Sequence, residues 1–158
     1  MLDAASVMTR FVVTAGPDAT MTELAKTLAQ HAISGLPIVD QNGKLLGIVS
    51  EGDLMRQFTH TGEQRRSWWL HMLADGDRLA PEFLEYVRLD RRQARDMMQT
   101  DVVTTTEDAT LPEIAELMGR HRIKRLPVVK DGKLVGIVTR ADLVKAVARY
   151  PEAFAHPA

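Results

Sequence analysis

The chain has 158 residues, of which 45% are hydrophobic and 26% are charged, and its formal net charge is −1. This length allows one ordinary domain or two small ones with a real core, and the composition is that of a globular protein. Because the charge is nearly balanced, we expect no general electrostatic attraction to nucleic acid. The chain has no cysteine, which excludes disulfides, thiolate metal sites and cysteine nucleophiles.

The sequence also bears on location. Residues 1–6 lack the basic and apolar regions of a secretory signal. The longest apolar runs, such as residues 45–49, have about five residues, whereas a membrane span needs about 20. We therefore expect a cytoplasmic protein that does not enter a membrane.

Two copies of one pattern occupy most of the chain. Val12-Val13-Thr14 recurs 90 residues later as Val102-Val103-Thr104, and the segment that ends in Leu36-Pro37 recurs as the segment that ends in Leu126-Pro127. The offset then falls to 89, because the first copy has one more turn residue. We expect four parts: a first domain at 6–58, a helical spacer at 59–95, a second domain at 96–149 and a flexible tail at 150–158.

Each copy has the same order of predicted elements. In the first copy these are a β-branched strand at 12–14, a helix whose capping box is Thr20 with Glu23, a strand from Pro37, an Asn-Gly hairpin turn at 42–43, a returning strand at 45–49 and a helix from Asp53. The second copy repeats this order, with Thr110 and Glu113 as its capping box. The pattern predicts an α+β fold of two β-α-β-β-α units. Each sheet is too small to stand alone, so we expect the two to pack together.

The most specific part of the pattern is a proline-led strand, a glycine hairpin and a Gly-x-x-Ser/Thr-x-x-Asp turn. It occurs in both copies, from Leu36 to Asp53 and from Leu126 to Asp142. In these stretches the chain resembles a tandem pair of cystathionine-β-synthase (CBS) domains, or Bateman module. The resemblance covers about two thirds of the chain and implies a pair with pseudo-two-fold symmetry and a nucleotide cleft between the repeats.

In nucleotide-binding members of this family the Ser/Thr contacts phosphate and the Asp bonds the ribose hydroxyls. The resemblance assigns these roles to Ser50 and Asp53, and to Thr139 and Asp142. The chemistry agrees, because a helix start offers free N–H groups to phosphate and a carboxylate can accept from both hydroxyls of a diol. The alternative is that Ser50 and Thr139 are helix N-caps, with the Asp side chains satisfying the helix dipole.

The family also places apolar side chains and backbone groups of the first strand around the adenine. By position, the residues are Val12, Thr14, Ile33, Val102, Thr104 and Ile123. Core packing is the alternative for each Val and Ile.

The second copy carries four cations that the first copy lacks: Arg122, Lys124, Arg125 and Arg140. Cations on these loops favour a ligand with two or more phosphates. The alternative is a solvated basic face. His31 and His121 end equivalent helices, where we expect them to cap carbonyls rather than hold a metal.

The spacer contains both tryptophans, Trp68 and Trp69. It resembles the spacer of bacterial CBS pairs that often precede a BON domain, which we expect to be absent here. The tryptophans either cover the core or form a protein-contact patch.

We therefore expect a regulatory, energy-sensing module for signal transduction. Its ligand would be AMP, ADP, ATP or an adenosine dinucleotide such as NAD, and it would signal through the geometry of a homodimer to an unidentified downstream protein. We expect the dimer to use an exposed helical face that includes Leu24, Leu28, Ile114 and Met118, together with the helices that begin at Asp53 and Asp142. The alternative is a structural dimerisation module with an empty, vestigial cleft. No catalytic set, catalytic cofactor or metal site is visible in the sequence, so we expect no enzyme activity.

Overall fold

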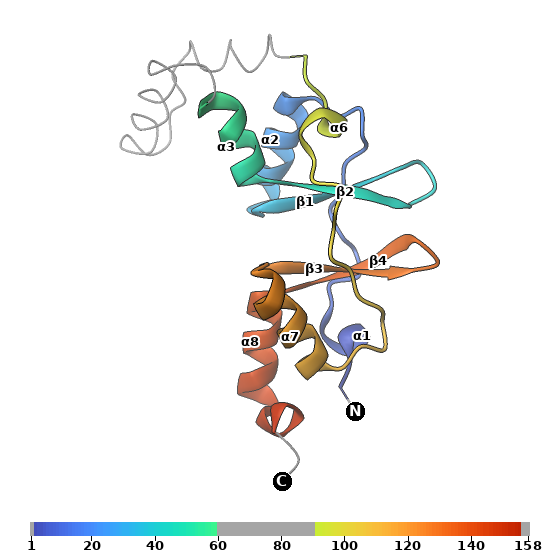
Figure 1. Cartoon of the computed structure of the whole chain (residues 1–158), viewed down its shortest axis with the longest axis vertical. Helices are drawn as coiled ribbons and strands as arrows, with labels where there is room; N and C mark the ends of the chain where they lie inside the picture. Colours follow the sequence, from blue (N-terminus) through green and yellow to red (C-terminus); the bar gives the residue numbers. More distant parts are fainter. Residues whose placement is uncertain (1, 60–90, 156–158) are drawn as a thin grey trace. The chain divides into compact units, whose positions relative to one another are not determined.

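The structure is a computed structural model that describes residues 2–59 and 91–155 (Figure 1). The predictions about Trp68 and Trp69, and most of the predicted helical spacer, lie outside the described residues. The chain divides into two compact units, which do not coincide with contiguous stretches of sequence. Unit 1 comprises Met1–Thr14, Val39–Leu45 and Asp101–Ala158, and unit 2 comprises Ala15–Ile38 and Leu46–Thr100. The domain boundaries drawn from the repeat stay a prediction.

The two copies form the same elements. The first contains α2 (Met21–His31), β1 (Gly35–Val39), β2 (Leu45–Ser50) and α3 (Glu51–Thr59). The second contains α7 (Leu111–His121), β3 (Arg125–Lys130), β4 (Lys133–Thr139) and α8 (Arg140–Arg149). Each strand pair makes a two-stranded sheet, β1-β2 or β3-β4, with the two helices of its copy against it (Figure 1). The predicted α+β fold class is confirmed.

The helices α2 and α7 begin at the capping boxes that the sequence predicted. Thr20 and Thr110 are the N-caps of α2 and α7, and each forms a complete capping box with the glutamate three residues later. The reciprocal hydrogen bonds satisfy two N–H groups that a helix start leaves without partners.

The two hairpin turns differ by the one residue that separates the copies. In the second, Asp131 and Gly132 both have positive φ, 54° and 79°, as a two-residue hairpin turn requires. In the first, only Gly43 has positive φ, 84°, and the Asp40 carboxylate accepts from the amides of Asn42 (2.8 Å) and Lys44 (2.9 Å). A side chain therefore closes the longer turn.

The predicted first strand of each copy is wrong in extent. Residues 12–14 and 102–104 are not in a strand, and only single parallel bridges form, between Ala15 and Ile38 and between Thr105 and Val128. The Thr105 amide donates to the Pro127 carbonyl (3.0 Å), and the Val129 amide donates to Thr105 (2.9 Å). A parallel ladder that continued toward residue 103 would next use the Pro127 N–H, which proline lacks. Pro37 has the same effect in the first copy.

Each unit is completed by the segment that begins the other copy. Helix α1 (Ala4–Val7) belongs to unit 1, where the Ala4 amide donates to Ala109 (2.9 Å) and Thr9 exchanges two backbone hydrogen bonds with Ile137. Helix α6 (Ala94–Met97) belongs to unit 2, where the Ala94 amide donates to Ala19 (2.8 Å) and Gln99 exchanges two hydrogen bonds with Ile48.

The apolar helix faces that we expected to be exposed are instead buried. Leu24 and Ile114 are 0% exposed, and Leu28 and Met118 are 5% exposed. Ile114 and Met118 belong to the core cluster of unit 1, together with Leu126, Val128 and Val138 of its sheet. A small two-stranded sheet needs other elements to bury its apolar side chains, and these helix faces do so in each unit, so they serve the core.

The predicted flexible tail begins with a packed turn. Residues Pro151–Phe154 form the 3₁₀ helix η1, which contacts α7 and α8. Ala153 and Phe154 pack against the core of unit 1. Within residues 2–59 and 91–155, no helix combines the length and the apolar character needed to cross a bilayer.

Candidate functional site

Both Ser/Thr-x-x-Asp motifs lie where a strand turns directly into a helix. In unit 1 the Thr139 amide donates to Asp142 Oδ2 (2.8 Å), and the Asp142 amide donates to Thr139 Oγ1 (3.2 Å). In unit 2 the same bonds join Ser50 and Asp53, at 2.8 and 3.2 Å. Each motif is therefore a helix-capping device, as the alternative interpretation of the sequence held. A cap at a helix start also leaves backbone N–H groups of the first turn available to an anion.

A backbone hydrogen bond ties the preceding loop to each motif. The Arg140 amide donates to the Lys124 carbonyl (2.8 Å), and the Glu51 amide donates to the Ser34 carbonyl (2.9 Å). Arg125 also lies opposite Thr139 in the β3-β4 register. The fold thus gathers Lys124, Arg125 and Arg140 around the cap of α8.

The cations are placed in different ways. Lys124 and Arg140 are exposed, and Arg125 is half-buried. Arg122 is exposed and is the C-cap of α7, in the left-handed conformation with φ 53°. Its counterpart Ala32 has the same conformation, with φ 51°. The structure therefore places two exposed cations beside the motif of the second copy, where the first copy has Ser34 and Glu51.

The predicted adenine-side residues are divided between the units. Ile33 lies in unit 2 with Ser50 and Asp53, whereas Val12 and Thr14 lie in unit 1. Unit 1 also contains Val102, Thr104 and Ile123. Thr14 is exposed, and the other five of these residues are half-buried. Ile123 packs against the core of unit 1, so the core interpretation holds for part of its surface.

The two motif carboxylates differ most in their hydrogen-bond partners. Asp53 is 3% exposed. Besides the Ser50 amide, its carboxylate accepts from Ser50 Oγ (3.0 Å), from Gln99 Nε2 (3.0 Å) and from the Arg56 guanidinium. Asp142 is half-buried, and its carboxylate accepts only from the Thr139 amide within residues 2–59 and 91–155.

Sequence reasoning missed Arg56 and Gln99. Arg56 follows Asp53 by three residues in α3, a spacing at which helical side chains meet, so this pair could have been found. Gln99 lies 46 residues from Asp53, and no local signal connects them.

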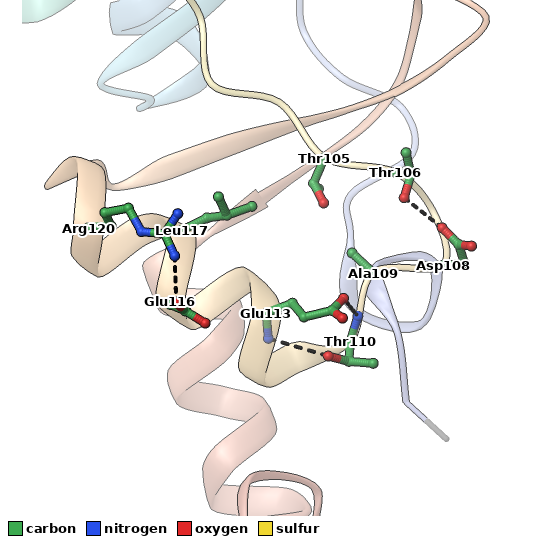
Figure 2. A pocket seen from close by; sticks show the side chains of 9 residues that line it. All are labelled: Thr105, Thr106, Asp108, Ala109, Thr110, Glu113, Glu116, Leu117 and Arg120. Carbon is green, nitrogen blue, oxygen red and sulfur yellow. Dashed lines mark hydrogen bonds and ion pairs between the residues drawn. The ribbon is translucent and has the colours of Figure 1, made fainter.

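A cavity of about 460 Å³ lies elsewhere in unit 1, beside the start of α7 (Figure 2). Its lining includes Thr105, Asp108, Glu113, Glu116, Leu117 and Arg120. Glu113 is engaged in the Thr110 capping box, and Arg120 pairs with Glu116 (2.5 Å). Three carboxylates and one guanidinium give this cavity a negative balance, which disfavours phosphate. None of the predicted ligand residues lines it.

Comparison with known proteins gives the same picture of two copies. The family model for the CBS domain matches residues 4–60 and 94–149. An uncharacterized protein of Methanocaldococcus jannaschii, MJ1426, is 31% identical over an alignment of 149 residues, and the match covers 82% of this chain and 82% of MJ1426. The inosine-5′-monophosphate dehydrogenase of the same organism is 30% identical, but this chain covers only 24% of its length.

Solved structures share the fold over nearly the whole chain. CBSX2 of Arabidopsis thaliana, solved in complex with AMP, has a TM-score of 0.73 at 24% identity, with 96% of this chain and 99% of CBSX2 covered. The CBS domain pair of protein MJ0100, solved with 5′-methylthioadenosine and S-adenosyl-L-methionine, has a TM-score of 0.69 at 26% identity. That match covers 94% of this chain and 98% of the other.

The unequal partners of Asp53 and Asp142 predict unequal effects on stability. Asp53→Ala leaves four donors without their acceptor, and we expect the free energy of unfolding to fall by about 2–3 kcal/mol. Asp142→Ala removes one capping bond, and we expect a loss of about 1 kcal/mol. Urea unfolding followed by circular dichroism measures both. Equal losses would contradict the assignment of Asp53 as the more deeply bonded carboxylate.

Proposed function

The chain belongs to the CBS domain family, and on this premise we propose that it is a regulatory module that binds an adenosine-containing ligand. The turn from β4 into α8 carries the proposal. It combines a capping Thr139, the half-buried carboxylate of Asp142 and the exposed cations Lys124 and Arg140. The adenosine ligands of the MJ0100 pair support the ligand class.

Each group at this turn has a chemical task in the proposal. The Asp142 carboxylate accepts hydrogen bonds from the two ribose hydroxyls. The backbone N–H groups at the start of α8 and the Thr139 hydroxyl donate to the phosphate, and the cations Lys124 and Arg140 compensate the charge of the phosphate. Val102, Thr104 and Ile123 supply apolar surface and backbone groups to the base. Ser50, Asp53 and Ile33 have the corresponding roles in unit 2, and Val12 and Thr14 stay predicted ligand residues of unit 1. The proposed ligands are AMP, ADP, ATP or a dinucleotide such as NAD.

Signalling in this proposal takes place in the cytoplasm and uses a homodimer, whose geometry a downstream protein reads. The dimer surface is on α8. Val144 and Val147 are 65% and 45% exposed and lie three residues apart, so they make an apolar strip on one helix face.

A second function has one observation in its favour. The four donors around Asp53 fill the first carboxylate, as expected for a structural dimerisation module whose ligand sites are vestigial. The open carboxylate of Asp142 argues for the binding module instead.

The homodimer can be tested by light scattering at micromolar concentration. We expect a mass near twice the chain mass of 17.6 kDa. Val144→Glu/Val147→Glu should give monomers, because charges then replace the apolar strip. Phe11→Glu is the control, since Phe11 is 96% exposed in unit 1 and lies outside α8. A wild-type mass near 17.6 kDa would contradict the proposal.

Ligand binding can be tested by thermal shift and calorimetry against AMP, ADP, ATP and NAD. A ligand at 100 times its Kd stabilises the folded state by about 2.7 kcal/mol. We expect Asp142→Asn to weaken every adenosine ligand by about tenfold, the loss of roughly one charge-assisted hydrogen bond. Asp108→Asn, in the acidic cavity, is the matched control and should keep the wild-type affinity. A panel with no stabilising ligand would favour the vestigial module.

The cations predict a preference for added phosphates. Lys124→Ala/Arg140→Ala should weaken ATP binding by roughly 30-fold at most, because exposed ion pairs contribute up to about 1 kcal/mol each, and should change AMP affinity less. Lys130→Ala/Arg149→Ala removes the same charge from exposed sites away from this turn and serves as the control. Calorimetry at two salt concentrations measures both, since salt screens exposed charges. An unchanged ratio of AMP to ATP affinity would assign Lys124 and Arg140 to the solvated surface.

A further inference from the structure

The carboxylate of Asp53 has no room for another donor. A carboxylate offers about four lone-pair positions. Oδ2 of Asp53 accepts from the Ser50 amide and hydroxyl, and Oδ1 accepts from Gln99 Nε2 and the Arg56 guanidinium. With four donors and 3% exposure, Asp53 is satisfied by the protein itself.

The carboxylate of Asp142 is built on the same cap but is open. Its Oδ2 accepts from the Thr139 amide. Within the described part of the chain its Oδ1 accepts no hydrogen bond and forms no ion pair, and the residue is half-buried rather than buried. Three of about four acceptor positions are therefore available to a diol.

Two substitutions between the copies account for the difference. Lys145 follows Asp142 by three residues, as Arg56 follows Asp53, but it is exposed and forms no ion pair with Asp142. Thr9 occupies the place of Gln99, because it exchanges with Ile137 the same backbone bonds that Gln99 exchanges with Ile48. A threonine side chain is too short to repeat the reach of the Gln99 amide. Each copy has the same scaffold, and only the first has the two covering side chains.

We propose that Arg56 and Gln99 form a latch that closes the first ribose site, so that the free chain binds one nucleotide, through Asp142, and not two. This inference rests on the proposed function, because it assigns the ligand to one of the two motifs. To bind at Asp53, the ribose hydroxyls must displace a charge-assisted hydrogen bond and an amide hydrogen bond. At the open positions of Asp142 they displace no donor from residues 2–59 and 91–155.

Both side chains of the latch lie at the surface of unit 2. The Arg56 side chain is 54% exposed, so its guanidinium already contacts solvent and loses little hydration by pairing with Asp53. Gln99 is exposed as well, and its place is fixed by backbone bonds to Ile48 rather than by its side chain. Removal of the two side chains therefore uncovers the carboxylate and leaves the backbone of unit 2 in place.

The experiment counts the nucleotides bound per chain by calorimetry, with AMP as the probe and ATP in a parallel series. We expect one site in the wild-type protein and two in Arg56→Met/Gln99→Ala, in which methionine keeps the apolar stem of the arginine. Lys145→Met/Thr9→Ala makes the matching changes in the second copy and should keep one site. Asp142→Asn should lower the affinity by about tenfold in the wild-type background. In the latch-free background it should leave one unweakened site, at Asp53.

The outcomes separate the latch from the proposed function. Two equal sites in the wild-type protein, or one site that persists unchanged in Arg56→Met/Gln99→Ala, would overturn the latch and leave nucleotide binding standing. No binding of AMP or ATP to either protein would overturn the proposed function, and the latch with it. Circular dichroism verifies that each variant is folded, and the wild-type stoichiometry tests the latch even where a variant is not.

Discussion

Each unit depends on a segment that begins the other copy in the sequence. Ala4 and Met8 are buried in the core of unit 1, and Ala94 and Met97 are buried in unit 2, far along the chain from the helices that they support. The glycine of each Gly-Ile-Val strand makes room for this segment. A Cβ at Gly47 would lie 2.7 Å from the Gln99 carbonyl oxygen, and one at Gly136 would collide with the Met8 side chain. Neither copy can therefore be completed by its own contiguous stretch of chain.

This exchange also gives the two motifs different surroundings. The turn from strand to helix is the same in both copies, with a Ser or Thr cap and an Asp that bonds back to it. The incoming segment then brings Gln99 to the first motif and Thr9 to the second. A buried carboxylate needs hydrogen-bond partners, and the deeper burial of Asp53 is matched by its four donors. Asp142 is only half-buried, so its carboxylate can remain open to solvent.

Much of the fold could be predicted from local signals. The capping boxes at Thr20 and Thr110 and the glycine turns follow from hydrogen bonds and backbone angles within a few residues of each other. The prediction of a first strand at 12–14 and at 102–104 is wrong in extent. Pro37 and Pro127 do lie in strands, but proline lacks the N–H that a longer parallel ladder would need. The prediction that the helix faces with Leu24 and Ile114 form a dimer contact is wrong, because the small sheets require these faces for the core.

The residue types of the candidate site could be predicted, but not whether each motif carboxylate is open or already hydrogen-bonded by the protein. The family resemblance pointed to Ser50, Asp53, Thr139 and Asp142, and the structure places each pair at a helix start. Whether such an Asp is open depends on long-range partners, and the 46 residues between Asp53 and Gln99 leave no periodic signal. The cations beside Thr139 were visible in the sequence, whereas the bond from Arg140 to Lys124 that gathers them was not.

The unequal motifs bear on how binding could be communicated. A ligand shifts a conformational equilibrium only by the difference between its affinities for the two states. Two open sites would bind with little difference between them, whereas a latched site couples binding to the release of Arg56 and Gln99. Gln99 lies in the segment that leads directly into unit 1 at Asp101, so its release changes a side chain close to the point where the chain passes from unit 2 to unit 1. The coupling is reciprocal. A partner that draws Gln99 away from Asp53 raises the nucleotide affinity of the first motif by a certain factor. A nucleotide bound at the first motif raises the affinity for that partner by the same factor. The free energy of the two hydrogen bonds from Arg56 and Gln99 to Asp53 thus sets the upper limit of this coupling free energy.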